Sequence, residues 1–261
     1  MNNLIDRHFQ AMTESAGLPL NWCQSENDST NMLEALQHFL EDQGVADVSY
    51  SSALRVNGSD DSVLVKRKGL PHSISSTLDP KTLQAYLKGP ARHDEVWCQL
   101  SETQTPVCVN HSRSRSLKQD RAAIFWSYLN VSGRVIVPIA SRHDDYWFKF
   151  FVLYLKTPEQ DSQAWFSERK QWLLPLLNRV SHVLSFDQTV EANPYLKLDV
   201  LSDTCRRIML FTSQGDSVKQ VAEKVGLSQE GVTYHITRVK RLFGAKNKTQ
   251  LIAALCHSQV I

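Results

Sequence analysis

The sequence lacks the features that define several large protein classes. No apolar stretch approaches the roughly 20 residues that a membrane-spanning helix needs. The first residues, MNNLIDRHFQ, have neither a basic end nor an apolar core, so we expect no secretory signal. The five cysteines are scattered without C-x-x-C spacing, which argues against a disulfide framework and a zinc site. We therefore expect a cytoplasmic protein that has no membrane anchor and binds no metal.

Motifs of enzymes and of phosphorylation-controlled domains are also missing. No G-x-x-x-x-G-K-[ST] motif predicts a phosphate-binding loop, and no nucleophile is paired with a base. Asp60 and Asp61 lie in a predicted turn and not at the end of an apolar strand, which argues against a phosphorylation receiver. The histidines show no metal-ligand spacing. The sequence thus predicts neither catalytic residues nor a cofactor.

Charge is present but unevenly distributed. The net charge is only +2, yet residues 200–261 carry nine Lys or Arg against four acids, a net +5. The remainder carries 20 basic and 23 acidic residues, a net −3. A basic end on a mildly acidic body is typical of a domain that binds a polyanion, although a merely solvated basic surface would have the same charge. The length of 261 residues favours two domains.

The first domain alternates between predicted strands and helices. Apolar periodicity predicts helices over 31–43, 81–87, 116–129 and 162–186. Strands are predicted over 45–56, 62–68, 95–100, 105–109, 134–140 and 147–156, the first two joined as a hairpin. This order predicts an α/β sandwich, an antiparallel sheet flanked by helices, over 1–186. The polar stretch 187–199, with Pro194, predicts a linker.

Residues 200–261 have the pattern of a small all-α domain of four helices. Ser202, Ser217 and Ser228 are each placed to cap a helix, and Gly226 suits the tight turn between the second and third. Leu227 is expected to insert its side chain between these helices. The last helix, 249–256, is expected to begin at a Thr249 cap. Two short helices joined by a glycine turn predict a helix-turn-helix motif.

The helix that follows Ser228 is amphipathic in the manner of a DNA recognition helix. Its apolar stripe, at i, i+4, i+7 and i+11, consists of Val232, Ile236, Val239 and Phe243. The opposite face presents Glu230, Thr233, Tyr234, Thr237, Arg238 and Arg241. Such a helix packs its apolar side on the domain and offers polar side chains to the major groove. We expect further contacts to DNA, mainly to phosphates, from Lys219, Lys240, Lys246 and Lys248.

This region resembles the C-terminal domain of LuxR-type regulators. The matching residues, at family spacing without a gap, are Leu201, Gly215, Ser217, Lys219, Val221, Ala222, Leu227, Ser228, Val232, His235, Val239, Gly244, Asn247, Thr249 and Gln250. The resemblance implies a dimer that binds an inverted repeat of double-stranded DNA. Cys205 replaces the usual Glu of the first capping box, and Gly231 and Thr233-Tyr234 replace common family residues near the groove. The operator is therefore not inferred from relatives.

The first domain resembles the autoinducer-binding domain of acyl-homoserine-lactone receptors. The local features are Asp79-Pro80 before a short helix, Trp97 beyond it, Phe125-Trp126, and the run Ser132-Gly133-x-x-x-Val137-Pro138-Ile139. The resemblance implies that Asp79 accepts a hydrogen bond from a ligand amide. It also implies that aromatic residues line an apolar pocket, for which the candidates are Tyr50, Trp97, Phe125 and Trp126. The alternative is that Asp79 only caps a helix and that the aromatic residues are core.

One departure from the receptors leaves the chemical identity of the signal open. They usually carry a Trp about thirteen residues before the Asp, where this chain has Lys66, and no Trp lies between Trp22 and Trp97. The sequence therefore predicts a quorum-sensing-type regulator under a small, partly apolar signal, either an acyl-homoserine lactone held by other donors or another molecule. The alternative is a ligand-independent regulator whose first domain serves dimerisation or protein interaction.

Overall fold

The computed structural model describes residues 29–54, 72–103, 105–111, 121–140, 147–156, 161–187, 193–197 and 200–261. The described residues divide into two compact units. The first holds helices α2 to α7 and most of a β-sheet, and the second holds helices α9 to α13.

The first unit is built on a five-stranded sheet in the order β2-β1-β5-β4-β3. Its strands are β1 (Val45–Leu54), β2 (His72–Ser76), β3 (Val107–Asn110), β4 (Gly133–Ile139) and β5 (Trp147–Leu155). Strand β4 runs antiparallel to both neighbours, with Val135 opposite Cys108 on one side and Leu153 on the other. All nine residues of the central strand β5 are buried, because helices cover both faces of the sheet. The predicted antiparallel sandwich is confirmed.

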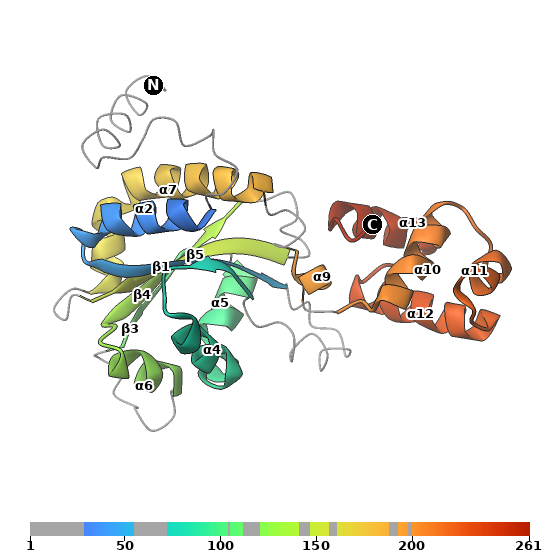
Figure 1. Ribbon diagram of the computed structural model, residues 1–261, viewed down its shortest axis with the longest axis horizontal. Coiled ribbons are helices and arrows are strands. Elements are labelled where there is room, and N and C mark those ends of the chain that lie inside the picture. Colours follow the sequence, from blue (N-terminus) through green and yellow to red (C-terminus); the bar gives the residue numbers. More distant parts are fainter. Residues whose placement is uncertain are drawn as a thin grey trace, which may run out of the picture. The chain divides into compact units, whose positions relative to one another are not determined.

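One face of the sheet is covered by helices α2 (Ser29–Glu41) and α7 (Ser162–Asp187), as Figure 1 shows. The core between them is apolar throughout. It includes Leu33, Leu36, Leu40, Val48, Tyr50, Val135, Val137, Phe151, Leu153, Trp165, Leu173 and Leu177. Alternate residues of β4 and β5 supply this core because successive side chains of a strand point to opposite faces.

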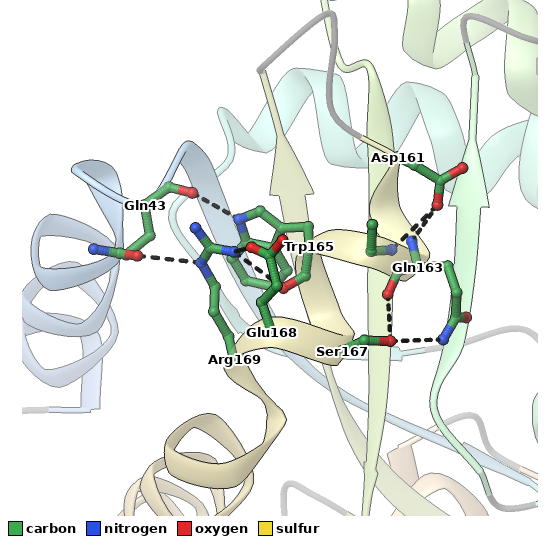
Figure 2. A network of polar contacts seen from close by, with 8 residues as sticks. Gln43, Asp161, Gln163, Trp165, Ser167, Glu168 and Arg169 are labelled. Atoms are coloured by element: carbon green, nitrogen blue, oxygen red, sulfur yellow. Dashed lines mark hydrogen bonds and ion pairs between the residues drawn. The ribbon is translucent and has the colours of Figure 1, made fainter.

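A polar network joins the start of α7 to the turn after α2 (Figure 2). Trp165 Nε1 donates to the Gln43 carbonyl at 2.7 Å, and Arg169 Nε donates to Gln43 Oε1 at 3.1 Å. The Arg169 guanidinium also lies 5.1 Å from the Trp165 ring centre. Asp161 caps α7 by accepting the Gln163 backbone N–H at 2.9 Å. These bonds satisfy groups at the helix ends and fix the register of α2 against α7.

The opposite face is covered by shorter helices: α4 (Pro80–Lys88), the 3₁₀ helix η1 (Pro90–His93), α5 (Val96–Thr103) and α6 (Arg121–Tyr128). The prediction of a strand over 95–100 is wrong, since this segment begins α5. The Asp94 carboxylate accepts the Val96 N–H at 3.3 Å, and Val96 and Leu100, one helical turn apart, are both buried. The predicted strand 62–68 and residues 116–120 of a predicted helix lie outside the described residues.

The second unit contains α9 (Pro194–Lys197), α10 (Asp203–Ser213), α11 (Val218–Val225), α12 (Gln229–Leu242) and α13 (Lys248–His257). The predicted serine caps all form, and Ser217 makes a reciprocal capping box with Gln220. Gly226 has φ +71°, the left-handed conformation that ends α11. Asn247, and not Thr249, caps α13, because its side chain accepts the Gln250 N–H at 2.8 Å.

Part of the polar stretch 187–199 is packed into this second unit. The Asn193 side chain is buried and donates to the Ser258 carbonyl at 2.7 Å and to the Gln259 carbonyl at 3.1 Å. Tyr195 stacks on Phe243, with ring centres 4.8 Å apart. The polarity of the stretch reflects hydrogen bonds to carbonyls at the end of α13 as well as exposure to solvent.

Candidate nucleic-acid interface and ligand site

Helix α12 has one buried side and one exposed side. Val232 and Val239 are fully buried, Phe243 follows them at the C-cap, and Ile236 is half-buried. The residues predicted to face the groove point away from this stripe. Glu230, Thr233, Tyr234, Thr237 and Arg241 are exposed and Arg238 is half-buried, with Tyr234 65% exposed. The arrangement is that of a helix held by its apolar side with a polar, cationic face available.

Many cations of this unit have no acidic partner. Arg206 pairs with Asp203 at 2.7 Å, and Lys224 pairs with Asp216 at 2.5 Å. Within the part of the chain that the structure describes, no ion pair forms at the predicted DNA-contacting cations Lys219, Arg238, Lys240, Arg241, Lys246 and Lys248. Unpaired cations near an exposed helix face are the electrostatic footprint of a phosphate-binding surface.

Some details of this unit differ from the sequence-based expectation. Leu227, expected between helices α11 and α12, is 38% exposed, and Val218, the first residue of α11, is 37% exposed. Both precede or begin a helix, where few neighbouring turns exist to cover a side chain. Burial raises the pKa of the Cys205 thiol, and the nearby Arg238 charge opposes that rise. The half-buried Arg238 of α12 therefore interacts electrostatically with Cys205 of α10.

In the first unit, three of the predicted pocket residues come together on the α4–α6 side of the sheet. The ring centres of Trp97, Phe125 and Trp126 lie 6.5, 5.7 and 4.7 Å from that of Tyr86. Tyr50 is not among them. It is buried on the opposite face of the sheet, against Phe151 at 4.8 Å, because it alternates with the residues of β1 that face α4–α6.

Asp79 is exposed and acts as the N-cap of α4. Its carboxylate accepts the Thr82 N–H at 3.0 Å and the Thr82 hydroxyl at 3.2 Å. Pro80 occupies the first position of the helix, as is common after a cap. The capping role, which the sequence left as the alternative, accounts for the hydrogen bonds that Asp79 makes.

A buried ion pair, which sequence reasoning missed, lies beside the aromatic residues. Arg134 on β4 and Asp94 after η1 are paired at 2.8 Å and are 1% and 5% exposed at their side chains. The Tyr86 hydroxyl donates to Asp94 at 2.5 Å and accepts from Trp97 Nε1 at 3.0 Å and from Arg134 at 3.3 Å. Burial raises the pKa of Tyr86 well above its usual value, so the hydroxyl stays a donor. The only sequence signal was an arginine inside the apolar run of β4.

His111, directly after β3, completes this cluster. Its Nε2 accepts a hydrogen bond from Arg134 Nε at 3.0 Å. Burial, and then the Arg134 charge, lower the His111 pKa to about 3, so the ring is neutral at physiological pH. Because an arginine only donates, Nε2 must be the unprotonated nitrogen, and the ring proton must reside on Nδ1.

Among the described residues, no group of three or more His, Cys, Asp or Glu could hold a metal ion. Likewise, no helix within the described ranges combines the length and apolarity needed to cross a membrane. What the two units do present is a cationic helix face and a buried polar and aromatic cluster.

The geometry of the second unit defines a helix-turn-helix DNA-binding domain. In agreement, residues 199–255 match the family model described as bacterial regulatory proteins, luxR family. This segment is a LuxR-type helix-turn-helix domain. A search of curated proteins finds no match to the chain.

Solved structures resemble the chain over most of its length. Escherichia coli SdiA aligns at a TM-score of 0.51 and 14% identity, covering 97% of this chain and 99% of SdiA. SdiA in complex with octanoyl-rac-glycerol aligns at 0.49 and 14%, covering 96% and 95%. CepR2 from Burkholderia cenocepacia, an N-acylhomoserine lactone dependent LuxR family transcription factor, aligns at 0.49 and 11%, covering 69% and 98%. The chain shares the fold of SdiA.

Proposed function

We propose that this protein is a cytoplasmic transcription regulator that binds an inverted-repeat operator as a dimer under the control of a small, partly apolar signal. Residues 1–186 serve as sensor and dimerisation domain, 187–199 as connection and 200–261 as DNA-binding domain. The observation that carries the proposal is the exposed, unpaired cationic face of α12 within a LuxR-type domain.

The two classes of side chain on α12 have different tasks in this proposal. Tyr234 and Thr237, both exposed, read base edges, and the Tyr234 ring contacts a thymine methyl group; the exposure of the two side chains supports this role. Arg241 and the neighbouring lysines hold phosphates, which set affinity and register without selecting sequence. Glu230, in the first turn, disfavours approach of a phosphate there and orients the helix.

Two-fold symmetric operators are read most simply by two copies of one domain, one on each half-site. Helix α7, the longest of the described helices at 26 residues, and α13 are the candidate dimer elements. A signal bound on the α4–α6 side of the sheet, where Trp97, Phe125 and Trp126 gather, controls DNA binding only if it favours the binding-competent dimer over other states.

The salt dependence of binding to an operator selected from a random-sequence library tests whether the exposed face of α12 contacts DNA. Arg241→Ala should reduce the slope of log affinity against log salt by about one, because one phosphate contact is lost. Arg206→Ala is the matched control, since Arg206 is already paired with Asp203, and its slope should stay unchanged. Equal slopes for wild type and Arg241→Ala would show that α12 is oriented wrongly in this proposal.

A ligand-independent regulator is the second candidate function, favoured by one observation. The Arg134–Asp94 pair and Tyr86 satisfy one another inside the first unit, so much of its polar interior needs no ligand. Melting of the purified protein with and without acyl-homoserine lactones and extract of spent culture medium separates the two. A ligand at about a hundred times its Kd adds roughly 2.7 kcal/mol and raises the melting temperature by several degrees. Operator binding with no such shift favours the second candidate.

A further inference from the structure

Two N–H donors of the α4–α6 side are buried without an acceptor. Trp126 is 0% exposed and His111 is 2% exposed. Across the described residues, no hydrogen-bond partner is within reach of Trp126 Nε1 or His111 Nδ1. Buried polar groups in proteins are nearly always hydrogen-bonded, since an unpaired donor forfeits its bonds to water without replacement. Each orphan donor therefore indicates a position where an acceptor atom belongs.

Both orphan donors belong to one cluster, centred on Arg134. The Arg134 guanidinium lies 5.2 Å from the Trp126 ring centre, and its Nε donates to His111 Nε2 at 3.0 Å. The second bond fixes the His111 proton on Nδ1, as argued above, so this nitrogen is a donor. An indole N–H is a donor under all conditions. The cluster thus offers two donors to an incoming group.

The same cluster has no comparable acceptor to offer. Asp94 Oδ2 accepts from Tyr86 and Arg134, and Oδ1 accepts from the Val96 N–H. The Tyr86 oxygen accepts from Trp97 and Arg134. Asp94 Oδ2 and the Tyr86 oxygen each already accept two hydrogen bonds, so a ligand N–H or O–H gains little from them.

The charge and the walls of the cluster narrow the ligand class further. Asp94 balances the Arg134 charge at 2.8 Å, so the cluster as a whole is neutral and does not favour an anion. Aromatic rings surround Trp126, with the centres of Tyr86, Tyr154 and Phe125 at 4.7, 4.9 and 5.0 Å. These rings favour contact with the apolar part of a ligand.

We propose that Trp126 Nε1 and His111 Nδ1 donate hydrogen bonds to acceptor oxygens of a neutral, amphipathic small molecule whose binding requires no hydrogen-bond donor of its own. The ligand class is that of ketones, esters and lactones with an apolar chain. This inference rests on the proposed function in so far as the ligand is its signal, and it moves the polar anchor from Asp79, whose carboxylate caps α4 at the surface, to the buried cluster.

The test uses the full-length protein and three probes with the same number of carbon atoms: 2-undecanone, undecane and undecanoate. The ketone should raise the melting temperature and bind about tenfold more tightly than the alkane, the contribution of one hydrogen bond. The carboxylate should bind more weakly than the ketone. In ¹⁵N-labelled protein, the indole signal that Trp126→Phe removes should shift on ketone addition and should not shift with undecane.

Trp126→Phe should lower ketone affinity by up to about tenfold, because one of the two donors is lost. Trp172→Phe is the matched control, because Trp172 packs on Phe39 on the opposite face of the sheet, and it should leave ketone affinity unchanged. Failure of the ketone to bind, equal affinities for ketone and alkane, or a Trp126→Phe variant that binds as tightly as wild type overturns the inference. The comparison of probes on wild type stands even if the variant does not fold.

Operator binding, measured on the same samples, separates this inference from the proposed function. If 2-undecanone does not bind but operator binding is intact, only the proposed ligand contacts of Trp126 and His111 are refuted. Absence of sequence-specific DNA binding refutes the regulator whatever the ketone does.

Discussion

Acidification should destabilise the first unit through His111. Its pKa is about 3 in the folded protein, lowered by burial and then by the Arg134 charge, against about 6.5 in an unfolded chain. A depressed pKa means that the unfolded chain binds the proton more readily. This contribution to stability is therefore complete above pH 6.5 and is lost as the pH falls towards 3.

The magnitude follows from the two pKa values. Between pH 7 and pH 5 the unfolded histidine becomes almost fully protonated while the folded one stays neutral, which costs about 2 kcal/mol of unfolding free energy. His111→Gln keeps an acceptor for Arg134 but cannot titrate. The variant should therefore lose about 2 kcal/mol less than wild type over the same pH interval, because the other titrating groups contribute equally to both.

Urea denaturation followed by tryptophan fluorescence is the appropriate assay. Trp97, Trp126, Trp165 and Trp172 belong to the first unit, so the signal reports mainly on that unit. If wild type and His111→Gln lose equal stability between pH 7 and pH 5, His111 is not a buried neutral ring. The assignment of its proton to Nδ1, and with it one anchor of the proposed ligand site, would then be refuted.

Three further predictions test the structure in other places. Asp94→Asn should destabilise the first unit by about 3–5 kcal/mol in urea denaturation, because Arg134 is left buried without its counter-charge; an effect below about 1 kcal/mol would mean that water reaches Arg134. Gly133→Ala should cost more in thermal melting than Gly226→Ala, since its Cβ would meet a backbone oxygen at 2.8 Å, whereas Gly226 pays only the roughly 1–2 kcal/mol of a left-handed residue; the reverse order would contradict the packing at β4. Asp79→Ala should lower stability by about 1 kcal/mol through loss of the α4 cap and leave the response to a signal intact; an abolished response would restore Asp79 as a ligand contact.

Much of the DNA-binding domain could be predicted because its determinants are local. Ser202, Ser217 and Ser228 cap helices through hydrogen bonds that span three residues, and Gly226 alone suits its left-handed turn. The apolar period of α12 then decides which side chains are exposed. Thr249 was misjudged as a cap because Asn247, two residues earlier, competes for the same role with a better-placed side-chain oxygen.

In the first unit, the sequence predicts the layers of the fold better than the contacts of its interior. The apolar runs of β4 and β5 and the periodicity of α2 and α7 identify the sandwich. The short alternation of apolar and polar residues over 95–100 favours a strand. In the structure the Asp94 carboxylate instead starts the helix α5, and Asp94 is held by Arg134, 40 positions along the chain. Tyr50 was grouped with Trp126 because residue type alone does not tell which face of a strand meets which helices.

The helix caps of the second unit and the exposed, cationic face of α12 follow from the sequence alone, since each depends on neighbours within a few turns of chain. Contacts between distant segments bury Arg134 and Asp94 together and place the His111 proton on Nδ1. Tertiary packing likewise buried Trp126 without an acceptor. These properties arise from desolvation and from charges brought together by the sheet, and desolvation depends on which distant segments exclude water from a side chain.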